Sequence, residues 1–296
     1  MAAVNRLEFD ILNSCFENDP SIIELRGYSE EEAALTRDSL MARGLISGNG
    51  ISQAGLDALE PYRVRRVVFL AAGFGSRMVP VTINTPKPLV RVHGKRIIET
   101  LLDAVLDAGI DEIYIVRGYL GEQFELLKSR YPMIRLIENP EYDGTGTISS
   151  FYYAKDLLDN AYVLESDLVV SNPKVIHRYH FSSDFMGTPV GETDDWYLRT
   201  DENGIIREVG VGGSGKNCYK LIGMSYWNTE DGERLKNDIR EAYEAPEGKK
   251  LPMSFVPFRV YKDNYEVSVM PCKAGDVIEI DTFAELQAFD EIYKKH

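Results

Sequence analysis

The feature that most constrains this chain is a short apolar run, residues 67–70, that leads into a turn of small residues from Ala71 to Ser76. A buried strand that enters a glycine-rich turn is how α/β folds bring backbone N–H groups close to a phosphate chain. Arg77 and Lys87 add positive charge after the turn, and three prolines between residues 80 and 88 stiffen the backbone around them. The stretch therefore predicts a phosphate-binding turn at the end of a strand.

From residue 67 onward, segments typical of strands and of helices alternate. We expect strands at residues 67–70, 112–116, 134–138 and 161–165, and helices at residues 96–108, 122–130 and 147–158. This order predicts a mostly parallel, Rossmann-like α/β sheet whose ligands bind at the carboxyl ends of the strands. After about residue 182 the pattern changes to short aromatic-rich strands, with further helices at 229–243 and 282–294.

Residues 1–62 are expected to form a small separate domain, and residues 63–296 the main one. Helices predicted at 6–16, 21–25, 29–43 and 53–59, with a hairpin turn at 48–50, resemble a winged helix-turn-helix module. The module carries four arginines against eleven acidic side chains, a net charge of −7. Because phosphate contacts supply most of the affinity for DNA, this charge favours self-association, as in a homodimer, or docking. A DNA-binding regulator with a nucleotide-sensing domain is the alternative from another class.

The whole chain is also acidic, with a net charge of −14, which argues against nucleic acid or acidic lipid as a partner. No apolar run approaches the ~20 residues of a membrane span, and the first residues lack the blocks of a signal peptide. Cys15, Cys218 and Cys272 are far apart in the sequence, so we expect reduced thiols in a cytoplasmic protein. His177 and His180 are expected on a helix, in a structural role.

Two groups of carboxylates are candidates for binding a metal ion. Asp167 follows the strand at 161–165, at the edge of the sheet where ligands bind. Glu279 and Asp281 alternate with apolar residues along a predicted strand at 277–281, so they share one face. Asp167 as a turn or helix cap, and Asp281 as the cap of the next helix, are the structural alternatives.

The turn from Ala71 to Ser76, called the glycine turn below, and the segment after it resemble the signature of nucleotidyltransferases. These enzymes join a nucleoside triphosphate to a phosphorylated small molecule and release pyrophosphate. The matching residues run from Leu70 to Thr82 and from Pro86 to Leu89. The resemblance implies a nucleotide-diphospho-sugar transferase fold, with Arg77 on the β- and γ-phosphates and Lys87 on the α-phosphate. It also implies that Asp167 and Asp281 hold one Mg²⁺, although Glu165 stands where the family has the first acid of an Asp-x-Asp pair. The nucleotide-binding residues that it implies are Leu70, Ala71, Ala72, Gly73, Gly75, Ser76, Gly118, Tyr119, Gly146 and Thr147.

The region from Arg63 to the end is most similar to the short bacterial CTP:phosphocholine cytidylyltransferases. This resemblance implies CTP and a phosphorylated small amine, most simply phosphocholine, as the substrates. A quaternary ammonium is held by aromatic faces and nearby carboxylates, and the residues expected to form that site are Trp196, Tyr197, Tyr226 and Glu279. The chain departs from the family at residues 251–255, which contain no carboxylate. An aminoalkylphosphonate or a sugar phosphate therefore stays open as the acceptor.

Overall fold

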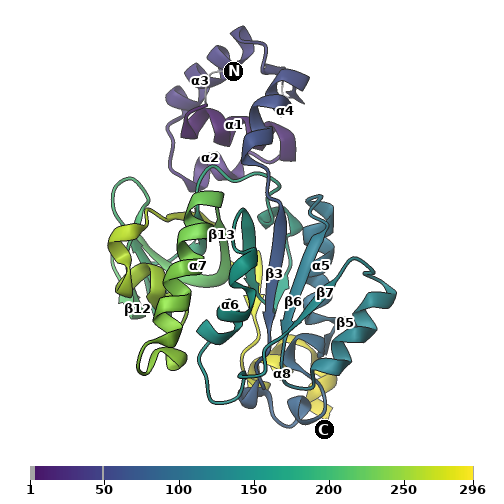
Figure 1. Cartoon of the computed structure of the whole chain (residues 1–296). Coiled ribbons are helices and arrows are strands. Elements are labelled where there is room, and N and C mark those ends of the chain that lie inside the picture. The colour runs from purple at the N-terminus through teal and green to yellow at the C-terminus, as the bar shows by residue number, and fades with distance from the viewer. Residues whose placement is uncertain (1–3, 49, 296) are drawn as a thin grey trace. The chain divides into compact units, whose positions relative to one another are not determined.

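The computed structural model describes residues 4–48 and 50–295, which form two compact units (Figure 1). The first unit takes the chain up to Val64 together with His177–Phe181, and the second takes Arg65–Ile176 and the chain from Ser182 onward. The division into domains at residues 62 and 63 stays a prediction. No helix in the described part of the chain combines the length and the apolarity that a membrane crossing requires.

The first unit is built from helices and one small hairpin. Its elements are α1 (Arg6–Glu17), α2 (Ser21–Leu25), α3 (Glu30–Ala42), β1 (Ile46–Ser47), β2 (Gly50–Ile51) and α4 (Gln53–Leu59). Asn5 and Ser29 begin α1 and α3 with reciprocal capping boxes, which satisfy backbone N–H groups at each helix start. Asn49, the middle residue of the predicted hairpin turn, lies outside the described residues. The order of elements matches the expectation for a winged helix, which stays a prediction.

The segment His177–Phe181 belongs to this first unit, and the prediction of a helix there is wrong. Tyr179 makes an isolated antiparallel bridge to Arg63, and the His180 N–H donates to the Tyr62 carbonyl at 2.9 Å. Tyr179 is also part of the apolar core of the unit, beside Phe9 and Leu12. Because the backbone of this segment bonds to residues 62 and 63 and Tyr179 packs in the core, the two histidines lie in a segment that is not helical.

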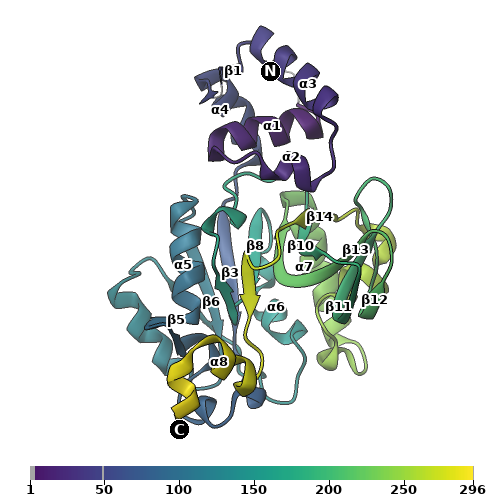
Figure 2. The same ribbon diagram turned by 180° about the vertical axis from the view of Figure 1, so that it is seen from behind.

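The second unit is organised around a sheet of nine strands (Figures 1 and 2). Its centre is four mutually parallel strands in the order β8-β3-β6-β7, with bounds β8 (Ala161–Glu165), β3 (Arg66–Ala71), β6 (Glu112–Arg117) and β7 (Arg135–Glu138). The predicted parallel, Rossmann-like core is confirmed. β3 is buried along almost its whole length, as expected for a strand with a parallel neighbour on each side.

The antiparallel part of the sheet extends beyond β8. It contains β13 (Cys218–Trp227), β11 (Glu192–Thr200) and β12 (Ile206–Ser214). β10 (Asp184–Pro189) pairs antiparallel with β13, and β14 (Ser268–Pro271) pairs in parallel with β10. These are the aromatic-rich strands expected after residue 182. A separate pair, β9 (Leu168–Val170) and β15 (Val277–Glu279), brings the end of the chain back beside the end of β8.

Helices cover both faces of the parallel strands. The crossover helices α5 (Ile97–Asp107) and α6 (Ile148–Ala154) lie on opposite faces (Figures 1 and 2), because the chain moves in opposite directions along the sheet before and after β7. α7 (Thr229–Glu244) packs against α6, and α8 (Phe283–Phe289) lies near the C-terminus.

Four predicted elements differ from the structure in type or length. Residues Gly121–Ser129 form a 3₁₀-helix, and the Arg117 guanidinium donates to the Gly121 carbonyl at its start. The helix predicted at 147–158 ends at Ala154 and continues as a 3₁₀ turn. The strand predicted at 277–281 stops at Glu279, and the helix predicted at 282–294 breaks at the extended residue Asp290.

Candidate active site

A cavity of about 770 Å³ opens at the carboxyl ends of β3 and β8. Its lining comes from segments that are far apart in the sequence, which the sheet brings to one edge. These segments are the glycine turn with Lys87, residue 185, and parts of residues 139–151, 163–167, 195–196, 221–225, 250–254 and 279–281. The predicted residues Leu70, Ala71, Ala72, Gly73, Gly75, Ser76, Arg77, Lys87, Gly146, Thr147, Asp167, Trp196, Glu279 and Asp281 all line it.

Lys87 bonds both Asp167 and Asp281, the two aspartates that are predicted to share a metal ion. Its Nζ donates to Asp167 Oδ2 and to Asp281 Oδ1, each at 2.7 Å, and Arg77 contacts the other oxygen of Asp281 at 2.9 Å. Burial alone would lower the pKa of Lys87, but the two carboxylates outweigh it and hold the pKa above its usual value. The two carboxylates therefore converge on one point, and Asp281 is not the cap of α8, a role that the Thr282 side chain takes.

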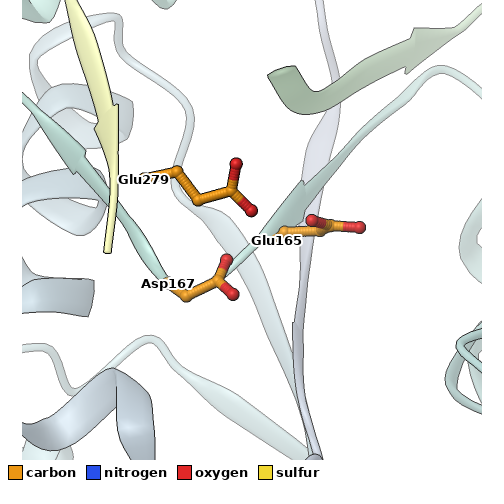
Figure 3. Close-up of side chains that lie close together, drawn as sticks. All are labelled: Glu165, Asp167 and Glu279. Atoms are coloured by element: carbon orange, nitrogen blue, oxygen red, sulfur yellow. The ribbon is translucent and has the colours of Figure 1, made fainter. Parts of the chain in front are cut away.

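A second set of carboxylates lies beside this group. Oxygens of Glu165, Asp167 and Glu279 all lie within 4.8 Å of one another, and Figure 3 shows the three side chains gathered at the ends of their strands. Burial, with the charge of Asp167, raises the pKa of Glu165 to about 8 and that of Glu279 to about 7. Such a concentration of negative charge favours the binding of a cation.

The residues present fit a divalent metal ion. The Asp167 Oδ1 atom is buried and has no hydrogen-bond partner within the described residues, although its other oxygen is bonded to Lys87. A buried carboxylate oxygen without a donor is costly, and an ion at that point would satisfy it. Carboxylate oxygens are also the ligands that Mg²⁺ prefers in proteins. Asp167 and Asp281 are the residues we expect to hold the ion, with Glu165 and Glu279 within reach.

The glycine turn is held open from two sides. Gly75 has φ +69°, a left-handed conformation that glycine adopts without strain, and a Cβ there would lie 3.0 Å from Lys87 Cβ. The Thr82 hydroxyl donates to the Gly75 carbonyl at 3.0 Å, and the Ser166 hydroxyl donates to the Leu70 carbonyl at 2.5 Å. These bonds leave the backbone of the turn facing the cavity.

Gly118 and Tyr119 do not line the cavity, and the structure gives them supporting contacts instead. The Tyr119 N–H donates to the Ala72 carbonyl at 3.0 Å, and its ring packs edge-on against Phe74 at 4.6 Å. A Cβ on Gly118 would lie 2.6 Å from the ring of Tyr142, which does line the cavity. The pair therefore braces the glycine turn and leaves room for Tyr142.

Gly146 and Thr147 form part of a closely packed wall. A Cβ on Gly146 would lie 2.4 Å from the Leu251 carbonyl oxygen, and the Thr147 hydroxyl accepts from the Met253 N–H at 3.0 Å. Behind them the fully buried Asn139 donates to the hydroxyls of Ser149 and Ser150 at 3.0 and 3.2 Å. Backbone and hydroxyl groups thus face the cavity on this side.

Of the three aromatic residues predicted to hold the acceptor, only Trp196 lines the cavity. Successive side chains of a strand point to opposite faces, so Tyr197 points away from Trp196 and bonds Glu208 at 2.6 Å. Tyr226 likewise points away from its neighbour Ser225, a cavity residue, and bonds Asn160 at 2.9 Å. Neither tyrosine lines this cavity, so the cavity does not support their assignment to the acceptor site, which stays a prediction.

Several cavity residues were not identified as site residues from the sequence. They are Asn139, Tyr142, Ser149, Ser150, Glu165, Asp195 and Ser254. Glu165 had a signal, since it stands at the first position of the family's acidic pair. Asp195 had no such signal; it reaches the cavity beside Trp196 in a strand whose register with β12 shifts between Thr193 and Trp196, and such bulges re-aim side chains.

The fold and this site define a nucleotidyltransferase, and comparisons with known proteins agree. A model of the MobA-like NTP transferase domain matches residues 67–185. The chain belongs to the cytidylyltransferases of the nucleotidyltransferase family, and it is an enzyme.

Two relatives of known activity and one solved structure are similar to the chain over about three quarters of its length. It is 38% identical to the 2-aminoethylphosphonate cytidylyltransferase of Lancefieldella rimae, over 76% of this chain and 92% of that protein. It is 31% identical to the choline-phosphate cytidylyltransferase of Streptococcus pneumoniae, over 77% of this chain and 98% of that protein. The solved CTP:phosphocholine cytidylyltransferase from Streptococcus pneumoniae superposes with a TM-score of 0.70 at 30% identity, covering 78% of this chain and 99% of that one.

Proposed function

We propose that the protein transfers CMP from CTP to 2-aminoethylphosphonate and releases pyrophosphate. The observation that carries this proposal is the 38% identity to a 2-aminoethylphosphonate cytidylyltransferase over 92% of its length, against 31% for a choline-phosphate enzyme. It favours the aminoalkylphosphonate alternative over phosphocholine. A cytoplasmic location and a homodimer stay predictions from the sequence.

The side chains around the cavity support a primary amine as the acceptor's head group. A quaternary ammonium has no N–H to donate and relies on aromatic faces, of which the strands β10, β11 and β13 contribute Phe185 and Trp196 to the cavity. Asp195 and the pair Glu165 and Glu279 supply carboxylates there. A primary ammonium donates three hydrogen bonds, so it can use these carboxylates directly.

The proposed reaction balances without an added base. An ionised phosphonate oxygen attacks the α-phosphorus of CTP, a new P–O bond forms, and the bond from the α-phosphorus to the bridging oxygen breaks as pyrophosphate leaves. Lys87, buried beside the glycine turn, is placed to stabilise charge on the α-phosphate. Arg77, which is largely exposed, is placed to take the departing phosphates. A bound Mg²⁺ supplies charge neutralisation for the triphosphate.

Pyrophosphate release with a panel of acceptors tests the proposal. The purified full chain is incubated with CTP and Mg²⁺, and separately with 2-aminoethylphosphonate, phosphoethanolamine, phosphocholine and glucose 1-phosphate. We expect kcat/KM for 2-aminoethylphosphonate to exceed that for phosphocholine at least about tenfold, a difference of ~1.4 kcal/mol in the transition state. Equal or better turnover of phosphocholine would contradict the proposal. It would favour phosphocholine, the second candidate, which the structural likeness at a TM-score of 0.70 supports.

A further inference from the structure

The tryptophan that lines the acceptor side of the cavity is backed by a stack of side chains. The ring of Trp196 meets the ring of Phe255 edge-on, with centroids 5.8 Å apart and planes inclined at 66°. The Arg259 guanidinium carbon lies 3.8 Å from the centre of the Phe255 ring. An edge-to-face aromatic pair and a cation above a ring are both attractive arrangements, so the three side chains form a stabilised series.

The last member of the series is anchored to the sheet. Arg259 Nη2 donates to the carbonyl of Val209 at 2.8 Å, and Val209 on β12 lies opposite Leu198 on β11, two residues from Trp196. Arg259 belongs to a turn of π-helix, Val256–Val260, whose residues Val256, Pro257 and Phe258 are buried. Single π-helical turns are frequent at functional sites, because they present side chains that a regular helix would not.

The segment that carries Phe255 also lines the cavity directly. Pro252, Met253 and Ser254 face it, and the Met253 N–H bonds the Thr147 hydroxyl on the nucleotide side. The start of the segment is thus bonded to Thr147 through Met253, and its far end is bonded to the sheet through Arg259. Arg259 is the second polar anchor of the segment, beside the packing of Val256 and Phe258 in the apolar core.

We propose that Arg259 is a positioning residue for the acceptor: through Phe255 it holds Trp196 at the position where the acceptor's aminoalkyl end packs. The inference rests on the proposed function, because it assigns this wall to the acceptor. Arg259 itself does not line the cavity, so it is not placed to touch either substrate. Its removal therefore changes the affinity for the acceptor and leaves the chemistry at Lys87 intact.

Steady-state kinetics of four variants test this assignment. Arg259→Ala is expected to raise KM for the acceptor about three- to tenfold, with kcat and KM for CTP within twofold of the wild type. Arg259→Lys, which keeps a cation over the ring, should restore most of the affinity, and Arg259→Gln should not. Arg207→Ala is the matched control, since this exposed arginine on β12 pairs with Asp201 and does not line the cavity.

Tryptophan fluorescence gives a readout independent of turnover. The chain has two tryptophans, and Trp227 is fully buried, so acrylamide quenching reports on Trp196. We expect stronger quenching in Arg259→Ala than in Arg207→Ala. An unchanged acceptor KM, or equal rises in the KM values for acceptor and CTP, would overturn the inference. The acceptor used is the member of the panel that the wild type turns over best. If the proposed acceptor is wrong, the wild type itself prefers another acceptor; if the role of Arg259 is wrong, only the kinetics of the variants show it.

Discussion

At the scale of single residues, Lys87 is where the two halves of the site meet. It lies after the glycine turn, and it bonds one aspartate beyond β8 and one beyond β15. Each of these carboxylates is held by a cation that the chain supplies. The neighbouring Glu165 and Glu279 have no side-chain partner of this kind in the described residues, so they are available to bind a cationic part of a substrate, beside the ion that Asp167 and Asp281 are expected to hold.

Replacement of Asp281 tests its place in the machinery. Asp281→Asn keeps the volume but removes the charge that Lys87 and Arg77 share, so we expect kcat to fall at least about a hundredfold while the melting temperature stays nearly constant. Pyrophosphate release and thermal unfolding measure the two effects. Glu285→Gln is the control, because Glu285 accepts the N–H groups of Asp281 and Thr282 outside the carboxylate group. Near-normal turnover of Asp281→Asn would remove it from the site.

The two glutamates are expected to act on the acceptor. Glu165→Gln and Glu279→Gln should each raise KM for 2-aminoethylphosphonate about tenfold, because each weakens a charge-assisted hydrogen bond to the ammonium, with a smaller effect on KM for CTP. Titration of the activity with Mg²⁺ is the companion measurement. A higher Mg²⁺ requirement with an unchanged acceptor KM would assign the glutamates to the ion instead.

The residue scale also shows where sequence reasoning succeeds. The glycine turn and Lys87 form a dense local motif, the two aspartates stand at the ends of strands that the sequence predicts, and the structure brings all of them to one cavity. Tyr197 was placed in the site by its aromatic character, although the alternation of a strand puts it on the face opposite Trp196. Asn139 and Tyr142 follow a strand end without any motif of their own, and only the packing of the fold shows that they reach the cavity.

At the scale of elements, the parallel strands were predictable because their apolar runs are long and bounded by turns. The type and the ends of the less regular helices were not predictable from the sequence. Residues 282–294 read as one amphipathic helix, but Asp290 accepts from the N–H groups of His93 and Ile292, and these bonds interrupt it. Helical periodicity carries no information about a partner that lies almost two hundred residues away, so the break is a tertiary effect.

One carboxylate joins three helical elements, and its pH dependence can be measured. Glu141 accepts from Lys249, from Tyr243 at 2.6 Å and from Tyr153 at 3.0 Å, and the bond from Lys249 with those from the tyrosines lowers its pKa from 4.5 to about 2. A lowered pKa in the folded state stabilises the fold above the ordinary value, and this contribution is lost as the pH falls toward 2. Glu141→Gln should therefore destabilise the protein more at pH 7 than at pH 2.5, as measured by urea unfolding. An equal effect at both pH values would contradict this.

At the scale of the whole molecule, the net negative charge distinguishes two interpretations of the first unit: a module that binds DNA, and a module for self-association or docking. A winged helix that binds DNA needs positive charge on its third helix, but α3 begins with Glu30, Glu31 and Glu32, and its first turn is exposed. Anisotropy of a labelled duplex with the full chain at about 150 mM salt should show no saturable binding up to about 10 µM, since non-specific binders reach Kd values of roughly 1–100 µM there. The matched variant Glu30→Lys/Glu31→Lys leaves Glu32 in its capping box with Ser29 and should bind more tightly, with a dependence on salt. Tight binding by the unmodified chain would show that the charge of this unit does not exclude DNA.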